Sequence, residues 1–590
     1  MTSDSPLADF EPALLGAQSI RFHRIDCAAA GDPVTAPLNW AQQHMLMLFQ
    51  ALEPETQSLN LSVWLVLRPG LSLDEVIEAL RDLLMSHEAL RTRYVPPPLG
   101  PAQRVLSEVS LPVAVVDCGE KVPDATVPAV VAALAGQPFD LENGSPIRAA
   151  VVLEDGSARY AAFALNHLIT DVTGWQWIKY HLRALLSDIP EDPRAPRVPY
   201  LMRDAAQWES SPAGVRLGSR AVAQHEATYR AMPQTMLPRP VQEVEAPRYR
   251  YLEFTSPLLA MAVPYLAARH NTTPAAVLYA GICSVAGFVS ALPGAFIQLT
   301  VGNRLEPQLH GAVGMYTQDV PARVDLADAS VADVIDRATP SILQAARFGR
   351  YPPIDLEAAR KRLELERGTA FDLSCWLNVV PIARISSSAQ RPSASQLAQA
   401  RTQGHWRWIE GTDNSTSTYF VFANGSEDAL VLTLIVDTAV LPAHEALAWV
   451  QAVERVLGAS VSQEIAVARI GEHAELSQVS RGADWTLSDG NWVRLPDVAA
   501  LVRGASAAAV TDVFAVPSPE GSRLTAFIDG GRHDLDLTRL HEECVAALPG
   551  NRTAMAPQEY VVCSGKPRTR DLAGWEMTPV LARGSGRVVG

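Results

Sequence analysis

Two apolar segments joined by a tight turn constrain the fold more than any other feature of this sequence. Residues 149–153 and 160–165 are apolar throughout, and Glu154-Asp155-Gly156-Ser157 between them has the composition of a hairpin turn. Upstream, Ser72 and Glu75 have the spacing of a capping box, and the apolar residues that follow recur with a period near 3.6. The sequence therefore predicts a strand pair at 149–165 and an amphipathic helix over 73–91.

The composition is that of a globular protein with several folding units. The chain has 590 residues, of which 48% are hydrophobic and 19% charged, and its formal charge of −15 argues against binding to phosphate backbones. The six cysteines form no C-x-x-C pair, which excludes a disulfide framework or a zinc ribbon. The sequence has no signal peptide and no apolar run of about 18 residues, so we expect a cytoplasmic protein that does not cross a membrane. We also expect no bound metal and no nucleic-acid partner.

The distribution of proline and polar residues suggests where the chain divides. Residues 189–199 are rich in proline and have the composition of a linker, whereas 386–404, rich in Ser, Gln and Ala, are expected to form a surface loop. A further break near Gly471 precedes short strand and helix patterns, which predict a small α/β unit. These patterns cover 510–516, 523–528 and 537–548.

One histidine stands out for its position. Among thirteen histidines, only His167 has an aspartate four residues later, Asp171, and it follows directly after an apolar strand. A strand that ends in a loop can hold an imidazole rigidly at the edge of a cleft, where a general base is needed. The spacing alone favours a hydrogen-bonded core histidine and an ordinary loop acid, so a functional reading depends on the context.

Five segments in the same order carry a resemblance to the condensation domains of nonribosomal peptide synthetases. Their order and spacing agree with that family over about residues 36–460. The segments are Leu38-Asn39-Trp40-Ala41-Gln42-Gln43, Ser86-His87-Glu88-Ala89-Leu90-Arg91-Thr92-Arg93-Tyr94, Pro138-Phe139-Asp140-Leu141 with Pro146-Ile147-Arg148, Asn166-His167-Leu168-Ile169-Thr170-Asp171-Val172, and Val301-Gly302-Asn303-Arg304 with Gly311-Ala312-Val313-Gly314-Met315-Tyr316.

The resemblance implies an α/β fold with two chloramphenicol-acetyltransferase-like lobes in a V. It places an N-terminal extension at 1–35, a condensation N-lobe at 36–188 and a condensation C-lobe at 189–465. In the family, the phosphopantetheine arms of carrier proteins enter a tunnel from opposite faces and meet at the histidine. No cofactor is then bound permanently, because the substrate is carried on a partner's phosphopantetheine arm.

The resemblance also assigns roles to individual residues. His167 corresponds to the histidine that positions or deprotonates the acceptor amine, so it is the catalytic candidate. Asp171 corresponds to an aspartate that pairs with an arginine, here Arg304, and holds the loop in shape, so loss of Arg304 is expected to impair folding by about 3–5 kcal/mol. The N–H of Gly174 lies where it could face the tetrahedral oxyanion. Other polar and aromatic residues nearby are expected to pack rather than react: His87, His181, Trp175 and Trp177.

Three positions depart from the family pattern. Asn166 replaces the first signature histidine, Val172 replaces the signature glycine, and Thr317-Gln318-Asp319 stands where the bridge motif ends in Asn-Thr. An asparagine can still supply orienting hydrogen bonds. A β-branched valine does not easily adopt a positive φ, so if the glycine provides one, the loop must be reshaped or strained.

Residues 472–590 resemble the small mobile subdomain of adenylation enzymes. The segment Gly490-Asn491-Trp492-Val493-Arg494-Leu495-Pro496-Asp497-Val498 is similar to the hinge motif of those enzymes. Tyr560-Val561-Val562-Cys563-Ser564-Gly565-Lys566 is similar to the stretch that ends in their Gly-Lys pair. No Gly-rich phosphate loop accompanies Lys566, so we interpret this part as a relic or a docking module.

The sequence thus predicts an acyltransferase of natural-product biosynthesis. It would join an acyl or aminoacyl thioester on a carrier protein, supplied in trans, to an amine that is a small molecule or carrier-bound, or less readily to a hydroxyl. Two alternatives remain open at this point. One is a catalytically inactive condensation-like module that recruits a partner, and the other is an acyltransferase that uses a coenzyme A thioester.

Overall fold

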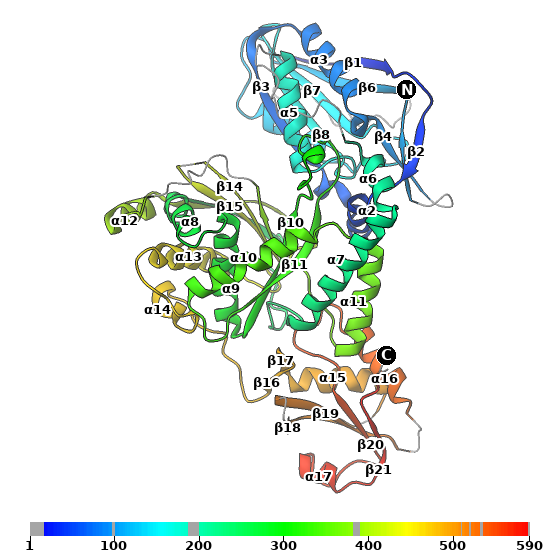
Figure 1. Cartoon of the computed structure of the whole chain (residues 1–590), viewed down its shortest axis with the longest axis vertical. Helices are drawn as coiled ribbons and strands as arrows, with labels where there is room; N and C mark the ends of the chain where they lie inside the picture. Colours follow the sequence, from blue (N-terminus) through cyan, green and yellow to red (C-terminus); the bar gives the residue numbers. More distant parts are fainter. Residues whose placement is uncertain are drawn as a thin grey trace. The chain divides into compact units, whose positions relative to one another are not determined.

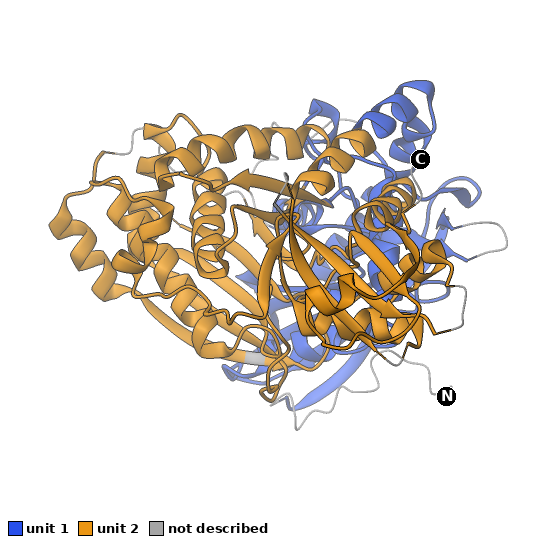
Figure 2. Cartoon of the chain, turned by 90° about the horizontal axis from the view of Figure 1, so that it is seen from below, with its two compact units in different colours: residues 1–220, 302–318, 349–353 blue, residues 221–301, 319–348, 354–590 orange. Residues whose placement is uncertain are grey.

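The computed structural model describes residues 17–96, 101–186, 200–380, 390–426, 428–508, 510–518, 521–531 and 535–587. It divides into two compact units (Figures 1 and 2). The first unit comprises 1–220, 302–318 and 349–353, and the second comprises 221–301, 319–348 and 354–590. The linker predicted at 189–199 lies outside the described residues.

A five-stranded sheet forms the centre of the first unit. Its order is β1 (Ser19–Ala28), β6 (Glu108–Asp117), β7 (Ile147–Glu154), β8 (Ser157–Leu165) and β3 (Leu61–Leu71). The strands β7 and β8 are the predicted pair, and they run antiparallel with Ile147 opposite Leu165. Asp155 and Gly156, with φ of 48° and 73°, form the turn between them, as a two-residue hairpin requires.

Helices cover both faces of this sheet. Residues of α2 (Trp40–Leu52), α3 (Leu73–Ser86) and α5 (Val172–Leu186) form the main core on one face, and α4 (Thr126–Ala135) packs on the other. The predicted helix over 73–91 begins with the expected capping box but ends at Ser86, where an extended His87 leads into a 3-10 turn over Glu88–Arg91. The unit also contains the short strands β2 (Val34–Pro37), β4 (Thr92–Val95) and β5 (Ala102–Val105), the helix α6 (Met202–Glu209) and the start of α7 (Pro212–Ala231).

The second unit is built on a seven-stranded sheet. Its order is β11 (Gln318–Asp325), β10 (Gly294–Val301), β12 (Cys375–Val379), β14 (Tyr419–Gly425), β15 (Leu430–Asp437), β9 (Tyr249–Ser256) and β13 (His405–Thr412). Ser256 and Thr273 cap α8 (Pro257–Arg269) and α9 (Pro274–Ser290) with a proline in the first helical turn. The remaining helices are α10 (Val331–Arg347), α11 (Pro353–Arg367), α12 (Ala394–Gln403), α13 (Ala443–Ser460) and α14 (Ile470–Ala474).

The prediction of a surface loop at 386–404 is wrong for most of that segment. Residues 394–403 form α12, which begins with a capping box between Ser393 and Gln396. Leu397 and Ala400 are buried, and the helix packs against α8. Two apolar residues three positions apart are enough to attach a short helix here, although the segment is polar in composition.

The last 120 residues form a second, smaller sheet within the second unit. The order is β18 (Thr511–Ser518), β19 (Gly521–Asp529), β20 (Glu559–Cys563) and β21 (Val580–Gly584), with β19 and β20 parallel. The helices α15 (Leu495–Ser506) and α16 (Leu537–Ala546) contribute to its core, and the hairpin β16 (Trp485–Ser488) and β17 (Asn491–Arg494) precedes it. The short α17 (Leu572–Glu576) lies between β20 and β21 in the chain.

The hairpin that resembles an adenylation hinge is held by polar contacts inside the second unit. The Oδ1 atom of Asn491 accepts a hydrogen bond from the backbone N of Gln234 at 2.5 Å, and both atoms are buried. Arg367 donates to Asp489 at 2.9 and 3.1 Å, and Arg552 contacts Asp372 at 2.9 Å. These contacts join this hairpin and the last sheet to the part of the unit that contains the seven-stranded sheet.

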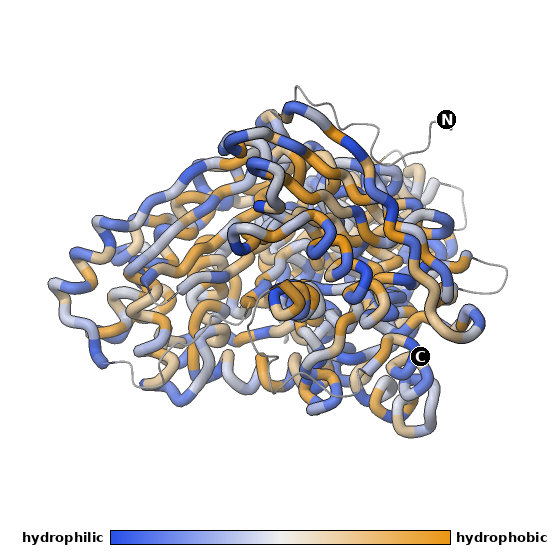
Figure 3. Tube along the Cα trace, turned by 90° about the horizontal axis from the view of Figure 1, so that it is seen from above, coloured by the Kyte–Doolittle hydropathy of each residue, from blue (hydrophilic) through white to orange (hydrophobic). Residues whose placement is uncertain are grey.

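Apolar residues are spread along the whole trace rather than collected in one long run (Figure 3). Among the described residues, no single helix has the length and hydropathy of a membrane span. In the described part of the chain, α8 and α9 are the one helix pair that together has this length and hydropathy, and they meet at a bend of 106° and are largely buried in the second unit.

Candidate functional site

His167 lies on the turn between β8 and α5, in the first unit. The last five residues of β8 are completely buried, so the strand fixes where the turn begins. Asn166 then shapes the turn, because its Oδ1 accepts from the backbone N of Leu168 at 2.8 Å while its own N donates to Pro146 O at 3.0 Å. Between residues 166 and 171, His167 alone is not fully buried. The backbone therefore presents the imidazole from an otherwise buried turn.

Asp171 ends this turn and begins the next helix. Its backbone O accepts from Trp175 N, and its Oδ1 accepts from Gly174 N at 2.8 Å, so it caps α5. Its Oδ2 also accepts from Tyr316 N at 3.1 Å and from the hydroxyl of Thr317 at 3.0 Å. The carboxylate, which is 1% exposed, has hydrogen bonds on both oxygens.

Arg304 is the ion-pair partner of this carboxylate. Its two terminal nitrogens each lie 2.8 Å from a different oxygen of Asp171, in a bidentate arrangement. The guanidinium also donates to the backbone O atoms of Gly302 and Gly314, at 3.0 and 3.2 Å, and lies over the ring of Tyr316. Arg304 thereby connects the His167 turn to the segment 302–318.

The ionisation of Asp171 depends on Arg304. Burial alone would raise the pKa of Asp171, but the charge and hydrogen bonds of Arg304, with the amides of Gly174 and Tyr316, hold it below its usual value of 3.8. Asp171 is therefore ionised at neutral pH. An ionised, fully hydrogen-bonded carboxylate is suited to holding the loop rather than to taking up a proton.

Gly174 has a packing and capping role. A Cβ atom at this position would lie 2.5 Å from the hydroxyl of Thr170 and 3.1 Å from the backbone N of Gly314. Only glycine therefore allows α5 to approach residues 312–316 this closely. Since the Gly174 amide donates to Asp171, the structure replaces the oxyanion contact expected from the sequence with a helix cap.

The first of the five segments, residues 38–43, also contacts the His167 turn and the segment 302–318. Asn39 and Gln42 form the capping box of α2. The Asn39 side chain also donates to Met315 O at 3.0 Å, and that of Gln42 donates to Leu168 O at 3.4 Å. Sequence reasoning recognised this motif but did not assign it to the site, because both contacts join residues more than one hundred positions apart.

The second motif packs beside the site. His87 and His181 lie together, with 3.0 Å between Nε2 and Nδ1, and burial lowers the pKa of His87 to about 4. Glu88 forms an ion pair with Arg203 on α6 at 3.0 Å. Trp175 is buried against Phe163, and Trp177 packs at the edge of the same core, as expected. Residues of this motif thus hold α3, α5 and α6 together.

Comparison with known proteins agrees with this arrangement. Residues 34–408 match the sequence profile of the condensation domain family. The chain belongs to the condensation domain family. The match includes all five segments that carry the resemblance and ends before the last sheet.

This condensation domain is similar to parts of much longer synthetases. It is 26% identical over 384 residues to phosphinothricin tripeptide synthetase PhsB of Streptomyces viridochromogenes, covering 61% of this chain and 31% of that protein. It is 24% identical over 437 residues to surfactin synthase subunit 2 of Bacillus subtilis, covering 72% of this chain and 11% of that protein. The chain thus spans less than a third of the length of these relatives.

The solved structures agree on the fold. The first condensation domain of the CDA synthetase superposes with a TM-score of 0.55 at 17% identity, covering 74% of this chain and 98% of that domain. The chain therefore has the α/β, chloramphenicol-acetyltransferase-like fold of condensation domains.

The three departures from the family pattern have a local explanation in this condensation domain. Asn166 forms the hydrogen bond that shapes the turn, and Val172 is the first residue of α5 and does not have a positive φ. The strain considered for Val172 is therefore absent. The hydroxyl of Thr317 donates a hydrogen bond to Asp171. The buried side-chain amide of Gln318 donates to Tyr351 O at 2.9 Å and accepts from Tyr351 N at 3.3 Å.

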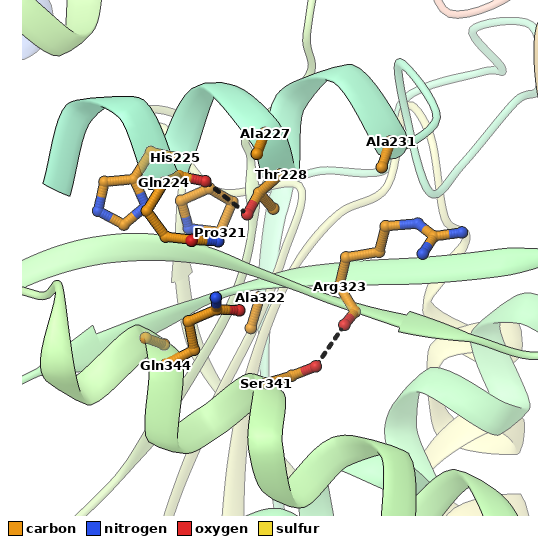
Figure 4. Close-up of a pocket in the computed structure, with 11 residues that line it drawn as sticks. Gln224, His225, Ala227, Thr228, Ala231, Pro321, Ala322, Arg323, Ser341 and Gln344 are labelled. Atoms are coloured by element: carbon orange, nitrogen blue, oxygen red, sulfur yellow. Dashed lines mark hydrogen bonds between the residues drawn. The ribbon is translucent and has the colours of Figure 1, made fainter. Parts of the chain in front are cut away.

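A pocket outside this turn lies in the second unit of the condensation domain (Figure 4). It has a volume of about 200 Å³ and is lined by residues of α7, β11 and α10. None of the site residues predicted from the sequence lines it.

Proposed function

We propose that this chain is a condensation enzyme of nonribosomal peptide or related natural-product biosynthesis. It would transfer an acyl or aminoacyl group from the thioester of a carrier protein, acting in trans, to an acceptor amine. The observation that carries the proposal is the placement of His167, partly exposed, on a turn fixed by buried Asn166 and by the Asp171–Arg304 pair. Rigid support of this kind is what a positioned acid–base group requires.

The reaction forms one bond and breaks one. The amine nitrogen attacks the thioester carbonyl carbon, the C–S bond breaks, and the carrier thiol is released as the amide forms. The amine loses one proton and the departing sulfur gains one. In this proposal, the imidazole of His167 orients the amine or accepts its proton, and Asp171 and Arg304 only hold the turn. A hydroxyl acceptor would give an ester by the same steps.

The proposal includes the organisation of the chain. Residues 36–188 would form the N-lobe and 189–465 the C-lobe, with 1–35 as an extension and 472–590 as the part similar to an adenylation subdomain. No cofactor would be bound permanently, because the phosphopantetheine arm belongs to the carrier. The polar contacts of Asn491, Arg367 and Arg552 support a fixed position for residues 472–590 against the C-lobe.

Turnover with a loaded carrier tests the proposal. The full chain is incubated with an acyl-loaded carrier protein from its own gene neighbourhood and a panel of amines, and the carrier is followed by intact mass. We expect deacylation with formation of the amide by the native chain but not by His167→Ala. Equal binding of the carrier by both proteins without product would support a recruitment module, and turnover of a coenzyme A thioester alone would support the other alternative.

A further inference from the structure

The pocket in the second unit contains one permanent charge. Arg323, on β11, lines it together with the uncharged side chains of Gln224, Thr228 and Gln344. His225 also lines it, and burial lowers the pKa of this histidine to about 4, so it is neutral at pH 7. No carboxylate lines the pocket, although the whole chain carries a formal charge of −15. The local charge is therefore opposite in sign to that of the protein.

The Nε atom of Arg323 lacks a partner among the residues that the structure describes. In the part of the chain that the structure describes, its side chain forms no ion pair, and its buried Nε has no hydrogen-bond partner. Arg367 and Arg552, also in the second unit, have carboxylate partners. A buried guanidinium nitrogen that lacks a partner has a free-energy cost that a bound anion would remove.

The backbone makes room for this guanidinium. Gly294, the first residue of β10, lies beside it, and a Cβ at that position would be 3.1 Å from one terminal nitrogen and 3.5 Å from Nε. The absence of a side chain at Gly294 thus leaves the space that the guanidinium occupies.

The amides of the pocket lie toward its other end from the Arg323 guanidinium, which extends beneath Ala231 (Figure 4). Gln224 on α7 and Gln344 on α10 extend toward each other across β11 (Figure 4). Their amides can donate and accept hydrogen bonds, and Ala227 and Ala322 supply small apolar surfaces between them. The volume of about 200 Å³ exceeds the roughly 150 Å³ that suffices for a benzene-sized molecule.

We propose that this pocket binds the oxyanion of a ligand, a carboxylate or a phosphate, through Arg323. A planar guanidinium matches both anions by paired hydrogen bonds. The two sources of such an anion are a free small-molecule acid and the phosphate of a pantetheine arm. The site lies within the second unit and is separate from the His167 turn.

Binding of defined anions to the full chain tests this site. Isothermal titration calorimetry is performed with inorganic phosphate, N-acetylglycine and 4′-phosphopantetheine. We expect at least one to bind the native chain, and Arg323→Gln to weaken it at least tenfold. Preference for N-acetylglycine would identify a carboxylate ligand, and preference for 4′-phosphopantetheine would identify the arm.

Two further variants make the result specific. Gln344→Glu keeps the size of the side chain and adds a negative charge, so it should also weaken anion binding at least tenfold. Arg337→Gln, on the same helix but outside the pocket, should have no effect. Circular dichroism of each variant checks the fold. No binding of any of the three probes at millimolar concentration, or equal affinity in Arg323→Gln and the native chain, would overturn the proposal. His167→Ala should bind the probes normally, so this result is independent of the proposed catalytic function.

Discussion

Replacing Arg304 by methionine tests whether the buried ion pair holds the His167 turn. The substitution keeps most of the apolar volume and removes two hydrogen bonds of 2.8 Å to Asp171, whose carboxylate is 1% exposed. Breaking a buried pair by removing one partner costs about 3–5 kcal/mol, because the other charge stays buried. Three hydrogen bonds to Asp171 remain, from Gly174, Tyr316 and Thr317, so we expect the lower part of this range.

The assay is calorimetric unfolding of the full chain. A loss of about 3 kcal/mol should lower the melting temperature of the transition that contains the first unit by about 6–12 °C. Arg583→Met is the matched control, because Arg583 forms a similar two-bond pair with Glu559 but is largely exposed, and exposed pairs contribute about 0–1 kcal/mol. A melting temperature within the range of that control would refute our account of the pair.

The same variant makes a prediction about pH. The folded-state pKa of Asp171 is held below its usual value of 3.8, so the stabilisation is present above that value and is lost as the pH falls through the folded-state pKa. In Arg304→Met, burial is no longer offset by the guanidinium, and Asp171 can become neutral by taking up a proton. The difference in stability between the native chain and the variant should therefore narrow on acidification, and a constant difference would contradict this reasoning.

Three other substitutions test side chains of the first unit. Gly174→Ala should cost about 1–3 kcal/mol in calorimetric stability, because the new methyl group would overlap the hydroxyl of Thr170, and an unchanged melting temperature would contradict the close packing. Asn166→Ala should lower turnover and stability by removing the bond to Leu168 N, worth about 1 kcal/mol, and unchanged turnover and stability would contradict this role of Asn166. Burial raises the folded-state pKa of Glu209 to about 7, so its contribution to stability is complete below pH 4.5 and declines as the pH rises through 7. Glu209→Gln should remove this decline in a series of urea titrations from pH 4.5 to 8. The same pH dependence of stability in the variant and the native chain would contradict the assignment of the raised pKa to Glu209.

The sequence predicted the local features of the fold well. The hairpin around Asp155 and Gly156 is specified by residues within a few positions of each other, as are the capping box at Ser72 and the proline-led helix starts. Helix α12 was missed because only Leu397 and Ala400 attach it, and the composition around them resembles that of a loop. Local pattern is informative where many neighbouring residues agree, and it fails where a short segment depends on a distant surface.

The candidate site was predicted in part. Motif order placed His167 after a buried strand and matched Asp171 to Arg304, which lie 133 positions apart and which spacing alone could not have joined. The role of Gly174 was misjudged, because its amide is used by the Asp171 carboxylate, a contact visible only in coordinates. The contribution of Asn39 and Gln42 was also missed, since hydrogen bonds to backbone O atoms leave no pattern in the sequence at the accepting residue.

The backbone conformation of Val172 bears on the choice between an enzyme and an inactive recruitment module. The replacement of the family glycine suggested a distorted or inactive loop, but Val172 lies in a regular helical turn behind the Asp171 cap. The backbone around His167 is thus free of the strain that would have argued for lost chemistry. What separates an enzyme from a recruitment module is then the reactivity of His167 itself.

The most direct test of the central claim is the rate at which the carrier thioester is converted to amide by the native chain and by His167→Ala, measured by intact mass of the carrier under single-turnover conditions. Circular dichroism establishes that both proteins are folded, and binding of the loaded carrier is measured for each. Our account predicts amide formation by the native chain and a loss of at least about 100-fold in His167→Ala with carrier binding unchanged. Equal rates in the two proteins would contradict the assignment of His167 as the catalytic residue.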